Sequence, residues 1–408
     1  MVSHFSNEFS CFQQYIPVMN NKIKLILLVL TVCVSCNKGQ DISRFDYNYT
    51  IPTEFGDGIK TASLQSVGMD DAPIREMMDY INSVNRHRIH NILIFRQNKL
   101  VFEEYFQGNA IDWNVSNLDG GVIEYNRETE HYMASVSKSV TSVITGAAIQ
   151  LGYLRDLNKK IIDYFPEYAG ILTGQKADIT IDHLLTMRCG LAFDENTYPY
   201  NNPQNDAYKM INADDPIEFV LSKPMTDTPG TKFFYNTGTT NVLARIIEKE
   251  SGMSFLDFSN QYLFNALGGK DGEWLMMANG LPMASGGLSI RARELSKIGL
   301  LFLNDGIWEG KQIIPKNWIT DSQQEKVNAN NGFFQNSSYG YQWWITRFKV
   351  NGEFYKCFFA AGWGDQFMFI IPGLELIAEF NCGNYLVSPK ISIINLLESY
   401  ILKAITRN

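Results

Sequence analysis

The stretch of sequence that decides the fold is Ala134–Ser142, ASVSKSVTS, at the start of a segment with a helical pattern. Apolar residues spaced three and four apart predict one buried helix face, and Ser135 and Lys138 fall on the opposite side. Gly152 predicts the end of this helix. An amine three residues after a hydroxyl can take its proton, so the pair predicts a nucleophile that needs no histidine. Ser135 would lie at a helix N-terminus, where backbone N–H groups stabilise negative charge.

The spacing of this pair is weak evidence by itself, because Ser35-Cys36-Asn37-Lys38 has the same spacing near the N-terminus. A second element is Tyr235-Asn236-Thr237-Gly238, which follows Pro229-Gly230-Thr231 and precedes a helical pattern. A tyrosine in the loop before a helix can reach the Ser-Lys pair and relay protons. The alternative is a half-buried aromatic ring that packs against that helix.

The composition is that of an acidic globular chain. It has 408 residues, of which 45% are hydrophobic, and it carries a net charge of −8. This length allows two lobes with a large core. The negative charge argues against nucleic acid as a partner. Residues 37–408 contain no H-E-x-x-H or C-x-x-C motif, so we expect no metal ion, and we expect no cofactor.

The N-terminus predicts a targeting segment over residues 1–36, with Met19 as the better start codon. The almost uninterrupted apolar run from Ile23 to Ser35 is too short to span a membrane and is typical of a signal sequence. Cys36 follows a small residue, as in a bacterial lipoprotein signal, and would carry a lipid. We expect an exported periplasmic or cell-surface protein that meets the membrane only through Cys36. An uncleaved signal anchor is the alternative.

Two further expectations concern the rest of the chain. Residues 37–68 are polar with few periodic apolar residues, which predicts a tether. Cys189, Cys357 and Cys382 predict buried small side chains rather than a disulfide framework. One bridge between Cys357 and Cys382 stays open, because both lie in neighbouring predicted strands.

Strand patterns near both chain ends, with helices between them, predict one sheet built from both termini. The predicted elements are a helix capped by Asp70 or Asp71 with Pro73 in its first turn, a hairpin of Ile92–Phe95 and Leu100–Phe102, helices and loops over 151–280, strands Phe367–Ile371 and Leu376–Phe380, and a final helix opened by Ser388-Pro389. We predict an α/β (α+β) protein with a sheet lobe of residues 69–130 and 283–408. A helical lobe of residues 131–282 would be inserted, with the active site between the lobes.

With these elements in place, the chain resembles the serine β-lactamase-like, penicillin-recognising hydrolases, from about Ile89 to Tyr385. It is most similar to the branch with class C β-lactamases, family esterases and 6-aminohexanoate-dimer hydrolase. The resemblance rests on ASVSKSVTS from Ala134, ITIDHLLTMRCGL from Ile179, PGTKFFYNTG from Pro229, ASGGLSIRARELSKIGLLFLNDGIW from Ala284 and AAGWGDQFMFIIP from Ala360. It implies the β-lactamase/D,D-peptidase-like fold, an antiparallel sheet flanked by N- and C-terminal helices plus an inserted, mostly helical lobe.

The resemblance also implies roles for individual residues. Ser135 would be the acylated nucleophile, Lys138 its general base, and Tyr235 the residue that passes a proton to the leaving group. Lys138 can act as a base only if its surroundings lower its pKa. The backbone N–H groups of Ser135 and Trp363 would form an oxyanion hole, worth about 3–4 kcal/mol per donor in other hydrolases. The expected substrate-binding residues are Thr237, Gly362 and Trp363.

Two positions depart from the family pattern. Thr237 stands where asparagine is usual, and Ala360-Ala361-Gly362 replaces a motif that begins with Lys or His and then Thr or Ser. Two alanines offer no donor to a substrate carboxylate, which would lose its water without gaining a partner. This favours a small neutral ester or amide. Trp363 adds an aromatic wall that suits apolar or ring-containing substrates.

Three hypotheses follow for function. The first is an esterase or amidase that forms an acyl-enzyme on Ser135, and the second is a penicillin-binding D,D-carboxypeptidase or β-lactamase. The third is a non-catalytic surface protein that kept the fold for binding. A Ser-His-Asp site would need His131 or His183 beside Ser135, and no G-x-S-x-G motif surrounds that serine. The oligomeric state cannot be read from the sequence.

Overall fold

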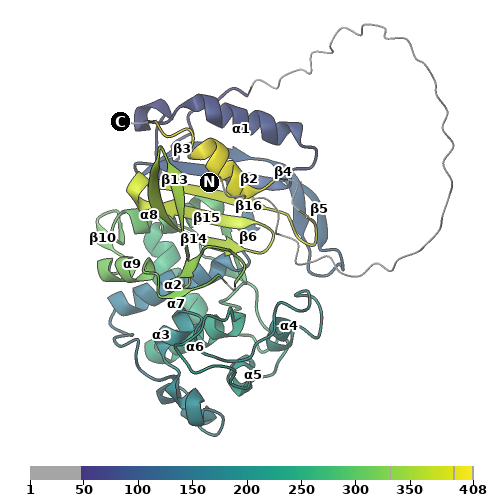
Figure 1. Ribbon diagram of the computed structural model, residues 1–408, viewed down its shortest axis with the longest axis vertical. Helices are drawn as coiled ribbons and strands as arrows, with labels where there is room; N and C mark the ends of the chain where they lie inside the picture. Colours follow the sequence, from purple (N-terminus) through teal and green to yellow (C-terminus); the bar gives the residue numbers. More distant parts are fainter. Residues whose placement is uncertain (1–46, 331, 389–390, 407–408) are drawn as a thin grey trace, which may run out of the picture. The chain divides into compact units, whose positions relative to one another are not determined.

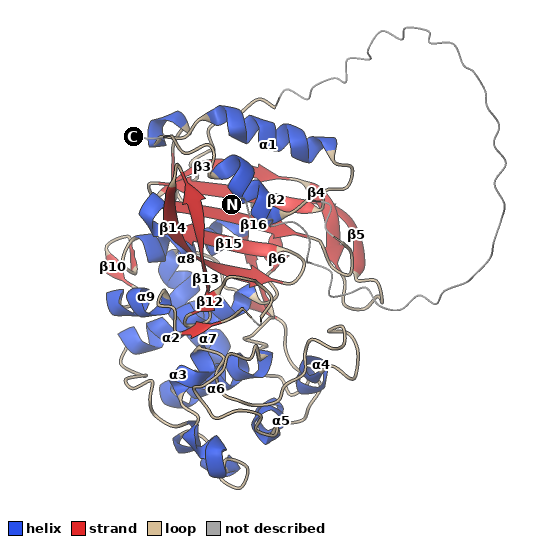
Figure 2. Cartoon of the chain, viewed as in Figure 1, coloured by secondary structure: helices blue, strands red, loops and turns tan. Residues whose placement is uncertain are grey.

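The structure is a computed structural model, and it describes residues 47–330, 332–388 and 391–406. The predicted leader (residues 1–36), its start at Met19 and its lipid site at Cys36 lie outside the described residues. A nine-stranded sheet occupies one end of the described chain, and helices occupy the other (Figures 1 and 2). In spatial order its strands are β1 (Lys60–Thr61), β3 (Lys99–Tyr105), β2 (Ile89–Arg96), β16 (Leu376–Cys382), β15 (Gln366–Ile371), β14 (Glu353–Gly362), β13 (Trp344–Val350), β12 (Ser338–Tyr339) and β11 (Val327–Asn328).

The centre of this sheet joins the two ends of the chain. β2 pairs antiparallel with β16, from Arg96 opposite Leu376 to Asn91 opposite Asn381. β2 also pairs antiparallel with β3, which confirms the predicted hairpin. Apart from the short parallel pairing of β1 with β3, the ladder is antiparallel, as the resemblance implied.

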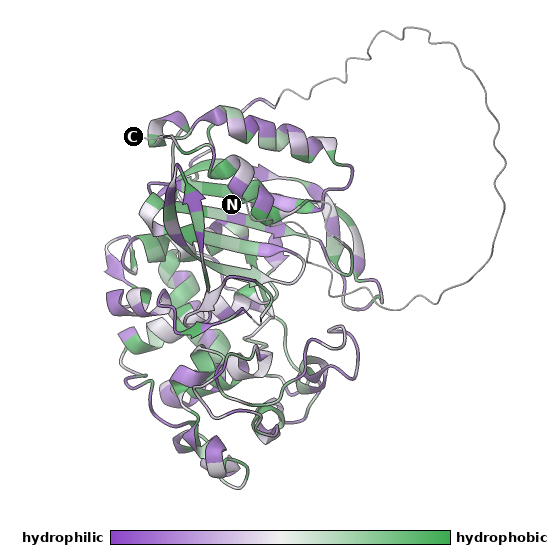
Figure 3. Cartoon of the chain, viewed as in Figure 1, coloured by the Kyte–Doolittle hydropathy of each residue, from purple (hydrophilic) through white to green (hydrophobic). Residues whose placement is uncertain are grey.

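The central strands are buried on both faces, which explains why they read as continuous apolar runs. Successive side chains of a strand point to opposite faces. Ile92 and Ile94 accordingly join the core that contains the N- and C-terminal helices, whereas Leu93 and Phe95 join the core that contains the central helices. Every residue of β2 is buried, and hydrophobic residues are concentrated in these strands (Figure 3).

The α-helices cover this sheet and build the helical end of the molecule. They are α1 (Asp71–Ser83), α2 (Val136–Gln150), α3 (Ile181–Leu185), α4 (Asp206–Ile211), α5 (Pro216–Ser222), α6 (Thr237–Ser251), α7 (Phe255–Ser259), α8 (Ala292–Leu303), α9 (Lys316–Ser322) and α10 (Ile393–Leu396). The predicted cap of α1 is confirmed, because the Asp70 carboxylate accepts a hydrogen bond from the N–H of Ala72. Along the described residues, we find no helix with both the length and the apolar character that a membrane span requires.

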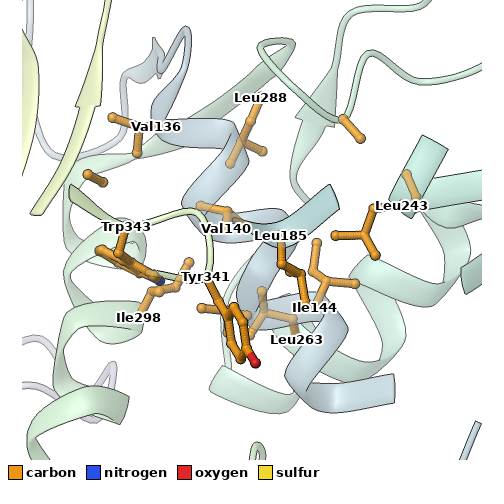
Figure 4. Close-up of a cluster of buried hydrophobic side chains, with 14 of the residues drawn as sticks. Val136, Val140, Ile144, Leu185, Leu243, Leu263, Leu288, Ile298, Tyr341 and Trp343 are labelled. Carbon is orange, nitrogen blue, oxygen red and sulfur yellow. The ribbon is translucent and has the colours of Figure 1, made fainter. Parts of the chain in front are cut away.

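Helix α2 is buried around its whole circumference, which differs from the two-faced pattern predicted for it. It lies between the sheet and the helical end, so its hydroxyl-bearing side is covered as well. Val136, Val140 and Ile144 pack in the cluster of Figure 4, with side chains from α3, α6 and α8. On the other side, the Ser139 hydroxyl donates to the carbonyl of Gln342 at 2.7 Å. The hydroxyl groups of Thr141 and Thr145 likewise donate to backbone carbonyl groups, and these hydrogen bonds allow short polar side chains to be buried here.

Two expectations about the chain ends are wrong. The segment predicted as a tether packs against the sheet from Tyr47 onward, because Ile59, Leu64 and Val67 are buried and β1 pairs with β3. The last helix begins at Ile393, where the Ser392 hydroxyl caps the N–H of Asn395, and not at Ser388-Pro389. The prediction for the cysteines is confirmed, because Cys189, Cys357 and Cys382 are buried free thiols. The bridge left open between Cys357 and Cys382 does not form, since β15 lies between their strands.

Three small sheets complete the fold. They are formed by β4 (Gln107–Ile111) with β5 (Asp119–Glu124), by β6 (Glu130–Tyr132), β8 (Leu288–Arg291) and β7 (Glu273–Trp274), and by β9 (Ile307–Trp308) with β10 (Lys311–Gln312). β6 leads directly into α2 and pairs with β8, so the small sheet fixes where α2 begins.

Candidate active site

Ser135 lies at the N-cap position of α2, immediately after a strained backbone. Ala134 has a φ of 45°, a left-handed conformation that costs a non-glycine residue about 1–3 kcal/mol and is common at functional sites. Hydrogen bonds hold this turn in place. The N–H of Met133 donates to the carbonyl of Leu288 at 2.8 Å, and the hydroxyl of Ser137 donates to the carbonyl of Ala134 at 2.6 Å. Ser135 therefore follows a hydrogen-bonded turn and lies at the helix N-terminus, where the sequence placed it.

Lys138 lies beside Ser135 and is almost entirely buried. Its Nζ atom is 3.0 Å from Oγ of Ser135 and 2.8 Å from the carbonyl oxygen of Ser285, and 2% of the residue is exposed. Burial lowers the pKa of Lys138 from its ordinary value of 10.5 to about 8. The Ser135 hydroxyl caps no backbone N–H of the helix, so it is free to interact with the amine. The pair has the geometry of a base and its nucleophile.

Tyr235 completes this group from the loop before α6. Its ring lies 5.0 Å from Nζ of Lys138, and the nearby Ser135 side chain lowers the pKa of its phenol against the effect of burial. Trp344 stacks on the ring with 5.9 Å between centroids. Burial raises the pKa of Tyr235, so the phenol stays protonated at neutral pH. The structure thus brings together Ser135, Lys138 and Tyr235 from segments 100 residues apart in the sequence.

A fourth group, Glu195, was not identified from the sequence. Its buried carboxylate accepts hydrogen bonds from the N–H of Thr237 at 2.7 Å, from the Thr237 hydroxyl, and from the phenol of Tyr200 at 3.1 Å. Burial raises the pKa of Glu195, and the nearby charge of Lys138 opposes that rise. Conversely, the charge of Glu195 raises the pKa of Lys138 against the effect of burial. Glu195 is therefore electrostatically coupled to the Ser-Lys pair.

Thr237 has a different partner from the one expected. We predicted a substrate-binding side chain, but both its N–H and its hydroxyl donate to Glu195, and the residue is 2% exposed. Glu195 gave no signal in the sequence because it lies in a polar loop without periodicity. Only its contact with Thr237, which lies 42 residues later in the chain, shows that Glu195 belongs to the site.

Gly362 brings the end of β14 against the nucleophile. A Cβ atom at this position would lie 2.4 Å from the carbonyl oxygen of Met133 and 3.2 Å from the backbone nitrogen of Ser135. Only glycine permits this approach. It places the start of the next residue, Trp363, beside the site, where the resemblance puts the second oxyanion donor. That role of Trp363 stays a prediction.

The two alanines that precede Gly362 lie on opposite faces of β14. Ala360 is fully buried opposite Met368, and Ala361 is half-buried opposite Phe367. Neither methyl group can bind a carboxylate. The end of β14 is therefore apolar next to the nucleophile.

The histidines named in the sequence analysis have other partners. His131 is hydrogen-bonded to His90 at 2.8 Å and to the carbonyl of Tyr132 at 3.0 Å, and burial lowers the pKa of His131 to about 4. His183 lies in the capping box of α3, where Nδ1 accepts from the N–H of Thr180. In the part of the chain that the structure describes, no three His, Cys, Asp or Glu side chains come together to hold a metal ion.

Comparison with known proteins identifies the family of the chain. The family described as "Beta-lactamase" matches residues 75–380. The 6-aminohexanoate-dimer hydrolase of Paenarthrobacter ureafaciens is 25% identical over 236 residues, which cover 54% of this chain and 58% of the hydrolase. The chain thus spans less than two thirds of that relative.

Solved structures share the fold. A Bacillus anthracis protein named after 6-aminohexanoate-dimer hydrolase has 24% identity and a TM-score of 0.62, covering 79% of this chain and 80% of its own. A family VIII carboxylesterase has 14% identity and a TM-score of 0.63, covering 84% of this chain and 98% of its own. Since the family match extends over most of its length, this chain belongs to the β-lactamase family and has the fold of the serine hydrolases in it.

Proposed function

We propose that the protein is a serine esterase or amidase that works through an acyl-enzyme on Ser135. The observation that carries this proposal is the 3.0 Å contact between the Ser135 hydroxyl and the buried amine of Lys138, whose pKa is lowered to about 8. At that pKa a useful fraction of the amine is neutral near pH 7–8 and can accept a proton. The relatives with hydrolase names support the same class of reaction.

The first half of the reaction forms the acyl-enzyme. Oγ of Ser135 attacks the carbonyl carbon while its proton moves to Nζ of Lys138. The backbone N–H groups of Ser135 and Trp363 stabilise the oxyanion. The tetrahedral intermediate then collapses, the bond to the alcohol or amine breaks, and Tyr235 donates its phenolic proton to the leaving group. Tyr235 recovers a proton from the Lys138 ammonium.

The second half releases the acid. Water loses a proton to the same base, attacks the acyl carbon, and Ser135 leaves with a proton. Lys138 and Tyr235 serve both halves, because the only buried carboxylate that we identify in the group, Glu195, is engaged by Thr237 and Tyr200.

The substrate we propose is small and neutral at the end that faces β14. A carboxylate in that place would lie against the half-buried Ala361 without a donor, and losing its water unpaired would cost several kcal/mol. This distinguishes the protein from the penicillin-binding and β-lactamase alternative, whose substrates carry that carboxylate.

A fluorophosphonate probe tests the proposal. The purified protein should form a covalent adduct on Ser135, located by mass spectrometry, and Ser135→Ala should form none. Ser142→Ala is the matched control, because Ser142 lies on the same helix and its buried hydroxyl has no hydrogen-bond partner. Equal labelling of Ser135→Ala, or no labelling of folded wild-type protein, would refute the acyl-enzyme.

We also propose export and lipid attachment at Cys36, on the sequence pattern alone. Metabolic labelling with a fatty acid should mark the wild-type chain in bacterial membranes. The Cys36→Ser variant should carry no label and should no longer be found in the membrane fraction. A labelled Cys36→Ser variant would contradict this assignment.

A further inference from the structure

The β4–β5 hairpin carries an exposed tryptophan at its tip. β5 is exposed along its whole length, and the hairpin is a separate two-stranded sheet. Trp113 is 39% exposed. Leaving so much indole in water forgoes the stabilisation that its burial would give. Exposed aromatic residues on loops are frequently used for binding.

The tip that holds Trp113 is ordered by its own hydrogen bonds. Oδ1 of Asp112 accepts from the N–H of Asn114 at 2.8 Å, and the N–H of Asp112 donates to the carbonyl of Leu118 at 3.1 Å. The N–H of Leu118 in turn donates to the carbonyl of Val115 at 3.0 Å. The backbone that carries Trp113 is thus ordered before any ligand binds, which reduces the entropy cost of binding.

Trp113 reaches the active site through two aromatic contacts. Its ring meets the ring of Trp363 with 6.0 Å between centroids at 45°, and the ring of Tyr132 at 5.5 Å and 83°. Trp363 follows Gly362, which lies against the backbone of Ser135, and Tyr132 precedes Ser135 by three residues. Both contacts of Trp113 therefore lie next to the nucleophile.

Trp363 connects this hairpin to the helical end of the molecule. Its ring also meets the ring of Tyr200 with 5.6 Å between centroids, and Tyr200 donates its phenolic hydrogen bond to Glu195. Indole and phenol faces bind flat apolar groups by stacking and by edge-to-face contact. The aromatic surface formed by Trp113 and Trp363 is therefore suited to a flat apolar group such as an aromatic ring.

We propose that Trp113 and Trp363 form a subsite for an aromatic ring of the ester or amide substrate, with Trp113 as the specificity-determining residue. This inference rests on the proposed function. Trp113 contacts the substrate and takes no part in proton transfer. Its effect is confined to substrates with a ring.

The test compares esters with and without a ring. For wild type and Trp113→Ala, kcat/KM is measured with 1-naphthyl acetate, methyl 1-naphthoate and ethyl acetate. We expect Trp113→Ala to lower kcat/KM roughly tenfold for at least one naphthyl ester and less than twofold for ethyl acetate. Trp113→Phe should restore part of the loss. Val122→Ala is the matched control, because Val122 lies on the same hairpin and is 57% exposed.

A binding measurement separates this inference from the proposed function. In the Ser135→Ala background, calorimetric titration with 1-naphthyl acetate should show binding that Trp113→Ala weakens roughly tenfold. Equal losses on all three esters, or unchanged naphthyl binding, would overturn the subsite. Absence of both turnover and fluorophosphonate labelling in wild type would overturn the proposed function, and the titration would still decide on the subsite.

Discussion

Glu195 accepts two hydrogen bonds from Thr237, one from its N–H at 2.7 Å and one from its hydroxyl. Thr237 is the first residue of α6, two positions after Tyr235. The Glu195 carboxylate therefore links its own loop to the start of α6, next to the segment that carries Tyr235. Its charge also acts on Lys138. One buried carboxylate thus contacts the residue two positions after Tyr235 and also raises the pKa of Lys138.

Replacing Glu195 with glutamine should shift the pH dependence of the reaction. The negative charge of Glu195 raises the pKa of Lys138, so its removal lets that pKa fall further. The neutral amine then exists at lower pH, and the acid limb of kcat/KM moves down by about one pH unit. Glu353→Gln, an exposed carboxamide substitution, is the control. An unchanged acid limb in Glu195→Gln would show that the two groups are not coupled.

The wild-type protein should gain activity as the pH rises through about 8. Only the neutral form of Lys138 can accept the proton of Ser135, and burial places the pKa of Lys138 at about 8. We expect log kcat/KM for an ester such as p-nitrophenyl acetate to rise with unit slope below pH 8 and to level off above it. Activity that is flat from pH 6 to 9, or that falls, would exclude Lys138 as the base.

Removing the buried amine should stabilise the fold while it abolishes activity. The pKa of Lys138 is lower in the folded protein than its ordinary value of 10.5, so the unfolded chain binds the proton more strongly. Burying the protonated amine therefore lowers the free energy of unfolding of the wild type below pH 8. This cost disappears as the pH rises from about 8 to 10.5, where the amine becomes neutral in both states.

Lys138→Met should therefore raise the free energy of unfolding at pH 7 by about 1–3 kcal/mol, and the gain should shrink toward pH 10. Urea unfolding at several pH values measures this difference. Lys403→Met, at a position with 61% side-chain exposure, should change little. A Lys138→Met variant less stable than wild type at pH 7 would contradict the stated cost of the buried charge.

Gly362→Ala should inactivate the enzyme without unfolding it. The added methyl would meet the carbonyl of Met133 at 2.4 Å and press on the backbone of Ser135, so the end of β14 must move away. Losing one oxyanion donor lowers kcat by about 10²–10³. Gly170→Ala is the matched control, because a Cβ there meets no atom within 4 Å. A near-normal kcat in Gly362→Ala would show that the end of β14 takes no part in the reaction.

β-Lactams should be poor substrates. Their carboxylate would face the methyl group of Ala361, which cannot donate a hydrogen bond. We expect no measurable nitrocefin hydrolysis and no labelling by a fluorescent penicillin under conditions in which the fluorophosphonate adduct forms. Stable labelling by penicillin would instead support the penicillin-binding alternative.

Local patterns were sufficient where neighbours in the sequence decide the structure. The cap of α1 at Asp70, the hairpin of β2 and β3, and the start of α2 at Ser135 all follow from short-range rules. The same rules failed for the segment after Tyr47, whose apolar residues are too sparse to show a period. They failed again at Ser388-Pro389, because an equally suitable cap, Ser392, follows four residues later.

The sequence by itself determined the family and the pairing of Ser135 with Lys138, because these residues lie one helical turn apart and need only that helix to meet. The tertiary structure alone decided the partners that come from distant segments. It buried α2 on all sides, and that burial lowers the pKa of Lys138. It placed Glu195 against Thr237 and Trp113 against Trp363. Such contacts depend on how the sheet and helices pack, and no short-range pattern encodes them.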